Sequence, residues 1–302
     1  MVNRTYLAVL IAGLFHIGMT TVLPAQEEKN TSDSLQTIVN LIQRGEWRSV
    51  LDTARELAAK DANNAPLLYV ADVAANVVGD YNQPPLGKFD FPFSDNQAMQ
   101  TLQSWAGKLL DAHPRNSNLL ILNGMLHTPV GDGNALQLIK YFEQARSIAP
   151  KDNFVLEILG AAYGEQGKFT LAIETLEKAI DIRPTSNGYS NLGVAVYKQG
   201  KVSTGEQYLK KAVELNARDA GAWFMLGTYY LERKRMQEAK QPLEKAVRLV
   251  PKMVQARWNL GGIYFYSGQR SKAIEQLKKI ISIAPDSPMG RQAKQMLTEL
   301  GG

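Results

Sequence analysis

The side chains most often used in catalysis are few and far apart in this sequence. Histidine occurs at positions 16, 113 and 127, and cysteine is absent. A zinc site or a nucleophilic triad needs several ligands or an oriented base at one point. His113 and His127 fall in different predicted helical hairpins, each without a companion motif. We therefore expect no catalytic residue and no metal site.

Two short segments imitate ligand-binding loops but lack an essential residue. The run from Gly164 to Thr170 contains Gly-Lys, yet a phosphate-binding loop needs glycine and serine or threonine where Ala162 and Phe169 stand. The segment starting at Asp61 begins like a calcium loop, but Pro66 replaces its obligatory glycine. We expect no cofactor, and the chain is predicted not to be an enzyme.

Composition and charge exclude a strongly basic nucleic-acid reader. The 302 residues are 45% hydrophobic and 21% charged, with a formal charge of +5. Lysine and arginine are mixed with acidic residues along most of the chain. The densest basic run, Arg233 to Arg235, lies in a predicted turn beside Glu232. Such a run is typical of a solvated turn, so no nucleic-acid partner is expected.

Residues 1–25 have the order of a secretory signal. Arg4 is followed by an apolar stretch from Tyr6 to Met19, and Ala25 offers a small residue for cleavage. We expect an extracytoplasmic protein, periplasmic or secreted. Alternatively, the uncharged run at 5–26 is long enough to remain as a membrane anchor, and a membrane partner is expected only in that case.

A period of 33 to 34 residues organises the second half of the chain. Leu-Gly begins at positions 159, 192, 226 and 260. At fixed distances after it come a turn residue, a small residue, a leucine, alanine or isoleucine, and usually proline. These columns are Gly167, Gly200, Lys234, Gly268; Ala172, Gly205, Ala239, Ala273; Leu176, Leu209, Leu243, Leu277; Ala179, Ala212, Ala246, Ile280; Pro184, Ala217, Pro251, Pro285.

These columns resemble the tetratricopeptide repeat family, and Tyr163, Tyr230 and Tyr264 fill its tyrosine position. The chain departs from the family pattern at Arg257, which replaces an early aromatic residue, and at Lys234, which replaces the turn glycine. The resemblance implies an all-α fold, an α-solenoid of about seven helical hairpins with a C-terminal capping helix.

After the signal segment at 1–25, the repeat boundaries predict three further parts of the chain. Residues 26–152 form divergent hairpins with an insertion loop at 79–96, residues 153–287 form four regular units, and residues 288–302 form the cap. In the loop, Phe89, Phe91 and Phe93 alternate, so they either dock on a partner or cover the loop's own apolar flank. Glycine in the Leu-Gly pair is expected to allow close helix approach, with Gly160 opposite Ala172. Pro242 predicts a local kink.

The resemblance also implies a binding surface, because in this family the first helix of each hairpin lines a concave wall. A protein or peptide partner is expected there, contacting Tyr197, Phe224, Leu231, Trp258, Phe265 and Tyr266. Some of these rings could instead pack on the capping helix. Capture of a C-terminal carboxylate is not predicted, since Glu157, Ser190, Phe224 and Trp258 occupy the slots that would need lysine.

The predicted function is therefore that of an exported scaffold or adaptor for protein–protein interaction in cell-envelope or secretion-related assembly. Two alternatives stay open. One is a membrane-tethered docking receptor, which requires that the apolar N-terminal segment be retained. The other is a carbohydrate- or peptidoglycan-binding module in which Trp258 and Tyr266 stack on sugars.

Overall fold

The computed structural model describes residues 37–60, 70–71, 73–74, 77–78, 96–126 and 135–301. Over these residues all regular secondary structure is helical and no strand occurs, which confirms the all-α prediction. The predicted signal at 1–25, the segment at 61–66, residues 79–95 of the insertion loop predicted at 79–96, and His127 lie outside the described residues. Asn96, predicted as the last loop residue, instead begins a helix.

The chain divides into two compact units, residues 1–155 and 156–302. In unit 1, a helix over residues 37–44 precedes α3 (Trp47–Lys60), and α5 (Asn96–Ala112), α6 (Ser117–Leu126) and α7 (Ala135–Ile148) follow. Helix α6 packs on both α5 and α7. The Trp47 indole donates to Asn118 Oδ1 at 3.1 Å, which joins the beginning of α3 to α6.

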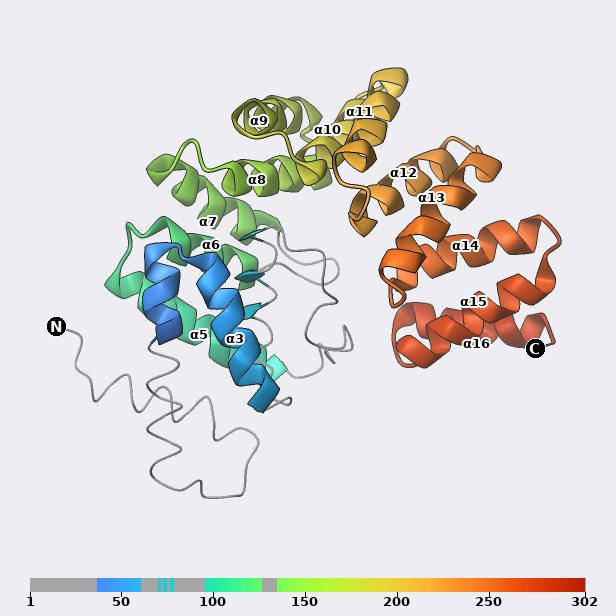
Figure 1. Ribbon diagram of the computed structural model, residues 1–302, viewed down its shortest axis with the longest axis horizontal. Coiled ribbons are helices and arrows are strands. Elements are labelled where there is room, and N and C mark those ends of the chain that lie inside the picture. Colours follow the sequence, from blue (N-terminus) through green and yellow to red (C-terminus); the bar gives the residue numbers. More distant parts are fainter. Residues whose placement is uncertain are drawn as a thin grey trace. The chain divides into compact units, whose positions relative to one another are not determined.

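Unit 2 is a series of antiparallel helix pairs, each packed on the next (Figure 1). Helix α8 (Asn153–Glu165) spans the boundary: its first residues belong to unit 1 and the rest to unit 2. The remaining helices are α9 (Phe169–Ile182), α10 (Ser186–Lys198), α11 (Val202–Leu215), α12 (Ala220–Glu232), α13 (Met236–Leu249), α14 (Val254–Tyr266), α15 (Arg270–Ile283) and α16 (Pro288–Glu299). One hydrophobic core extends from α11 to α15, so each hairpin buries the apolar face of its neighbour.

The turns within the hairpins require a left-handed backbone conformation at one residue. Gly167, Gly200 and Gly268 have φ of 70°, 104° and 71°, and Lys234 has φ of 59° at the equivalent place. Glycine adopts this conformation without a steric penalty, whereas the Cβ atom of lysine crowds the backbone. The structure thus shows why the column is glycine in three of the four repeats.

The Leu-Gly glycines lie where the two helices of a hairpin cross. A Cβ atom at Gly227 would lie 2.6 Å from Leu243 Cγ, and one at Gly193 would lie 2.8 Å from Leu209 Cγ. At Gly160 the residue that a Cβ would overlap is Leu176. The small residue predicted to face this glycine column does so in the next two repeats, where a Cβ at Gly193 would lie 3.0 Å from the Gly205 carbonyl oxygen and one at Gly227 would lie 3.4 Å from that of Ala239. The leucine four positions after the small residue therefore fills the space that the glycine leaves in the first three regular repeats, at Gly160, Gly193 and Gly227.

The last helix, α16, covers the end of the core. Ala293 is buried with Leu277 and Ile280 of α15, while Arg291 and Lys294 face outward and are exposed. The Ser287 hydroxyl accepts a hydrogen bond from the Gly290 amide at 2.9 Å and caps the helix N-terminus. In α13, Pro242 is buried, and the helix is continuous on both sides of it.

Candidate partner-binding surface

The six residues predicted to contact a partner all lie on the first helices of unit 2. Tyr197 is on α10, Phe224 and Leu231 are on α12, and Trp258, Phe265 and Tyr266 are on α14. Tyr197, Phe224, Leu231 and Trp258 are half-buried, whereas Phe265 is 39% and Tyr266 74% exposed. We call the surface that these six residues form with the other lining residues of α10, α12 and α14 the first-helix surface.

Phe265 and Tyr266 form the most exposed aromatic group of this surface. Their ring centroids are 5.3 Å apart, and the rings meet nearly edge-on at 74°. Edge-to-face packing holds the two rings in a defined arrangement while leaving them open to solvent. An exposed aromatic pair offers a large contact area to a partner.

Tyr197 connects two neighbouring repeats. Its hydroxyl donates to Glu232 Oε2 at 2.6 Å, and Lys198 Nζ approaches the same oxygen at 2.8 Å. Its ring also packs edge-on against Tyr229 at 5.2 Å. Burial and the bond to Glu232 raise the pKa of Tyr197, so the phenol stays protonated as a hydrogen-bond donor. The contact fixes the C-terminal ends of α10 and α12 against each other.

The other half-buried members contribute partly to the core. Phe224 and Leu231 pack against the main hydrophobic core. Trp258 packs against the small cluster of Leu277, Ile280 and Ala293, to which α16 contributes. The indole therefore has one side toward the cap, as the alternative prediction allowed for some of these rings.

Two further lining positions are buried and structural. Glu157 is 5% exposed and accepts hydrogen bonds from the Thr185 hydroxyl and from Asn187 Nδ2, the latter at 2.9 Å. Ser190 is 3% exposed. Both positions are closed to a ligand, and the Glu157 carboxylate links the first two regular repeats instead.

Gly262 is a lining residue that the sequence analysis did not select. It follows Gly261 in α14, and nothing lies within 4 Å of the place where its Cβ would be. A Cβ at Gly261 points elsewhere, with Gln276 Cβ of α15 at 3.6 Å. The pair Gly261-Gly262 occurs only in the fourth repeat, and that doubling was the available signal.

Arg257, a departure from the repeat pattern, repeats the hydrogen bond of the aromatic residue it replaces. Trp223 Nε1 donates to the Ala217 carbonyl at 3.0 Å, six residues earlier. Arg257 Nε donates to the Pro251 carbonyl at 2.6 Å, also six residues earlier, and its Nη1 donates to Gln276 Oε1 at 2.8 Å. Burial lowers the pKa of Arg257. The guanidinium thus closes the same inter-repeat turn as the indole.

A polar network on another part of unit 2 also joins adjacent repeats. Glu206 of α11 forms a two-oxygen pair with Arg235, at 2.6 and 3.3 Å, and accepts from the hydroxyls of Tyr229 and Tyr230 at 3.2 Å each. Lys210 lies 2.9 Å from the same carboxylate. The hydrogen bond from Arg235, followed by that from Lys210, lowers the pKa of Glu206 to about 2 against the opposing effect of burial.

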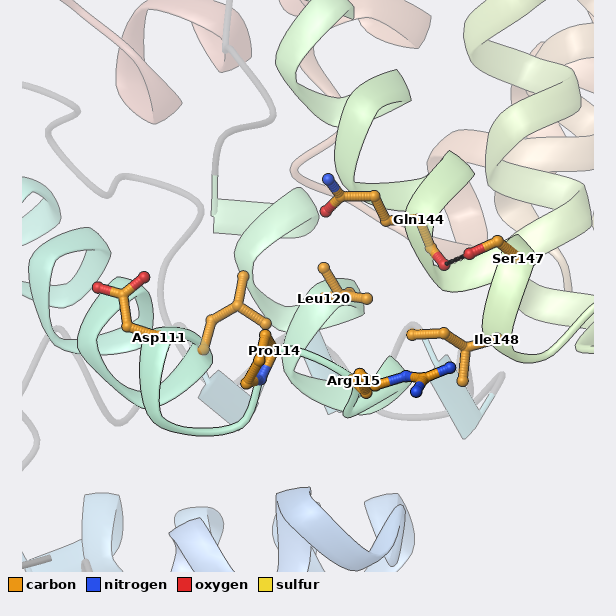
Figure 2. Close-up of a pocket in the computed structure, with 8 residues that line it drawn as sticks. Asp111, Pro114, Arg115, Leu120, Gln144, Ser147 and Ile148 are labelled. Atoms are coloured by element: carbon orange, nitrogen blue, oxygen red, sulfur yellow. Dashed lines mark hydrogen bonds between the residues drawn. The ribbon is translucent and has the colours of Figure 1, made fainter.

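In unit 1, a hollow lies between α5, α6 and α7 (Figure 2). Its volume is about 570 Å³, and its lining residues are Leu110, Asp111, Pro114, Arg115, Leu120, Gln144, Ser147 and Ile148. The Ser147 hydroxyl donates to the Gln144 carbonyl at 2.7 Å. The lining holds no histidine or cysteine and only one carboxylate, Asp111, so it offers no nucleophile–base pair.

Neither a cluster of metal-ligating side chains nor a long apolar helix occurs among the described residues. No group of three or more potential metal-ligating side chains comes together among them. Nor does any helix within the described ranges have both the length and the apolar character needed to cross a bilayer.

Comparisons with known proteins agree with the helical hairpins. Family models described as TPR repeat or tetratricopeptide repeat match residues 160–200, 190–253 and 230–297. A search of curated proteins found no match.

Three solved structures resemble the chain at low sequence identity. A tetratricopeptide repeat protein from Parabacteroides merdae is 14% identical with a TM-score of 0.57, covering 89% of this chain and 98% of its own. The APC/C hetero-tetramer Cut9-Hcn1 gives 18% and 0.58, covering 98% of this chain and 58% of its own. PilW, described as a type IV pilus biogenesis factor, gives 18% and 0.52, covering 67% and 94%.

At such identities these structures show the fold alone. Together with the matched repeats and the packed hairpins of unit 2, they establish a solenoid architecture. Residues 160–297, which lie within the described part of the chain, are therefore built of tetratricopeptide repeats.

Proposed function

We propose that the chain is a non-catalytic scaffold that binds a protein or peptide partner on the first-helix surface of unit 2. The observation that carries this proposal is the exposed ring pair of Phe265 and Tyr266 on α14. Aromatic side chains of this kind supply large contact area and are frequent hot spots in protein interfaces.

The composition of the first helices supports the same surface. Glu232 is the only charged residue of α12, and the only charged residue of α14 is Arg257, which is buried. A wall that is aromatic and nearly uncharged suits an apolar segment of a partner, either extended or helical.

The proposal includes a location outside the cytoplasm and a role in assembly of envelope or secretion machinery. Its support is the charged start, apolar stretch and small cleavage residue of positions 1–25. N-terminal sequencing of the protein from its native cells tests this directly, with Gln26 as the expected first residue. A chain that still begins at Met1 would favour the membrane-tethered receptor instead.

Site-specific photo-crosslinking tests the binding surface. A photoreactive phenylalanine analogue at position 265 or 266 is expected to crosslink a discrete partner in native cells. The same analogue at Gln241, an exposed residue of the second helix α13, is the control. Equal crosslinking from Gln241, or none from either aromatic position, would contradict the proposal. Crosslinking to glycan alone would favour the carbohydrate-binding alternative.

A further inference from the structure

Gly262 leaves an opening in the aromatic wall of α14. Residues four apart on a helix lie on the same face, so Trp258 precedes Gly262 and Tyr266 follows it along one stripe, with Phe265 beside them. Gly262 is half-buried, and no side chain fills the space above it. We call this space the Gly262 notch.

The notch has a backbone floor and aromatic neighbours. Ala161, Val194 and Thr228 hold the equivalent position in the three preceding repeats, so among the four regular repeats only the fourth lacks a side chain there. Helical glycine is unfavourable by about 1 kcal/mol relative to alanine. At Gly193 and Gly227 a close helix contact compensates for this cost, but Gly262 makes no such contact. Its absence of packing inside the protein directs attention to a ligand.

The charge of unit 2 indicates what flanks that ligand. Residues 156–302 contain 22 lysines and arginines against 14 aspartates and glutamates, a net charge of +8. On α14 itself Arg257 is the sole charge, and it is buried. Unit 2 as a whole therefore attracts acidic groups at long range, while the neutral face of α14 offers no charge of its own to pair with.

We infer that the Gly262 notch receives one large apolar side chain, such as phenylalanine, leucine or methionine, from a peptide segment whose flanking residues are acidic. This inference rests on the proposed function and specifies the partner of the same surface. The uncharged wall of α14 favours an apolar anchoring side chain in the peptide. The positive net charge of unit 2 favours acidic residues on either side of that anchor.

Selection of peptides on the full-length protein tests the inference. Random dodecapeptides displayed on phage are selected on the wild-type chain, and enriched peptides are synthesised and their dissociation constants measured. We expect enriched peptides to contain one large apolar residue among aspartates and glutamates. Raising the salt concentration should weaken their binding severalfold, because exposed charges are screened.

Three variants separate the notch from the stability of the fold. Gly262→Leu fills the notch, Gly262→Ala fills part of it, and Gly261→Ala adds a methyl group toward Gln276 on the other side of the same helix. All three replace a helical glycine and are expected to keep or raise the melting temperature. Gly262→Leu should weaken peptide binding at least about tenfold, whereas Gly261→Ala should change it less than about twofold.

The outcomes distinguish this inference from the proposed function. Enrichment of basic or wholly polar peptides, no enrichment, or equal affinity for the Gly262→Leu variant would overturn the notch. Crosslinking from position 266 that persists unchanged in Gly262→Leu would also refute it while leaving the proposed function intact. Absence of crosslinking from both position 265 and position 266, in a chain that carries no change at Gly262, would refute the proposed function itself.

Discussion

Lys234 holds a backbone conformation that glycine holds in the three equivalent turns, with φ of 59°. A side chain in this region costs roughly 1 kcal/mol relative to glycine. Lys234→Gly is therefore expected to stabilise the chain by about 0.5 to 1 kcal/mol, measured by urea unfolding. The reverse change at the sister turn, Gly268→Lys, should destabilise by a similar amount. A destabilised Lys234→Gly variant would show that the lysine side chain contributes more than its backbone strain removes.

Gly227 and Gly261 occupy the same column of the repeat but differ in the space around them. Because a Cβ at Gly227 would meet Leu243 at 2.6 Å, we expect Gly227→Ala to destabilise the fold by about 1 to 3 kcal/mol. At Gly261 the nearest atom is Gln276 Cβ at 3.6 Å, so Gly261→Ala should be neutral or stabilise by up to about 1 kcal/mol. Thermal unfolding of both variants measures the difference, and equal effects would contradict it.

The difference between these glycines shows where sequence reasoning stops at the residue scale. The sequence predicted that a column of glycine permits close helix approach, and Gly193 and Gly227 do so. It could not show that Gly261 is loosely packed. There the nearest atom belongs to Gln276, in the position that Thr175, Tyr208 and Pro242 hold in the other repeats. Nor could it show that Arg257 reproduces the hydrogen bond of an indole, because that depends on the direction of a long side chain.

At the scale of elements, the network around Glu206 couples α11 to α12 and to the start of α13. The pKa of Glu206 is about 2 in the folded chain, below the usual value of a glutamate, so ionised Glu206 stabilises the fold at neutral pH. This contribution is complete above about pH 5 and is lost as the pH falls toward 2. Protonation removes the pair with Arg235.

Glu206→Gln should therefore destabilise the chain at pH 7 by about 1 to 2 kcal/mol, a value reduced for the partial exposure of Arg235. The gap between wild type and variant should close between about pH 5 and pH 2. Urea unfolding across this range measures it, and Lys211→Gln, an exposed change on the same helix, is the control. A gap that is constant with pH would mean that the effect does not come from the carboxylate charge.

The capping helix α16 depends on a close backbone contact at Gly290. A Cβ atom there would overlap the Ala284 carbonyl oxygen, which is backbone and cannot move aside easily. Gly290→Ala is expected to shift or loosen α16 and to destabilise unit 2 by roughly 2 kcal/mol or more. Hydrogen exchange should show faster exchange in α16 and at Leu277 and Ile280, with the region of α10 less affected. Unchanged protection in α16 would be evidence against this contact as its anchor.

At the scale of the whole molecule, repeat spacing predicted the all-helical solenoid fold because each column reports a fixed packing requirement. Pro and Gly end or turn helices, and Leu and Ala fill the crossing, wherever the unit recurs. The charge difference between units escaped the sequence analysis. The excess of +8 in residues 156–302 becomes visible only when the chain is divided at its compact units.

The binding surface was harder to predict from the sequence than the fold. Lining positions were assigned by register, and register does not reveal burial: Ser190 and Glu157 are closed off, and Tyr197 is occupied by a bond to Glu232. The open position at Gly262 contains no side chain, so a search for aromatic and charged residues passed over it.

Unit 2 has its own core and cap, and we expect residues 151–302 to fold alone. Circular dichroism should show a helical fragment with a cooperative thermal transition. The fragment should be somewhat less stable at α8, because Phe154 loses its ring contact with Phe142 at 6.2 Å. An aggregated or non-cooperative fragment would show that unit 2 needs the preceding hairpins.

Because arginine, not tryptophan, stands at position 257, the fragment has few tryptophans, and one of them can serve as an intrinsic fluorescence probe. Residues 151–302 contain two tryptophans, Trp223 and Trp258. The first is fixed in a turn by its bond to Ala217, and the second lies on the stripe of α14 that includes Gly262. With Trp223 changed to phenylalanine, fluorescence emission would come from Trp258 alone. Occupation of the neighbouring notch could then be followed by titration without attaching a dye.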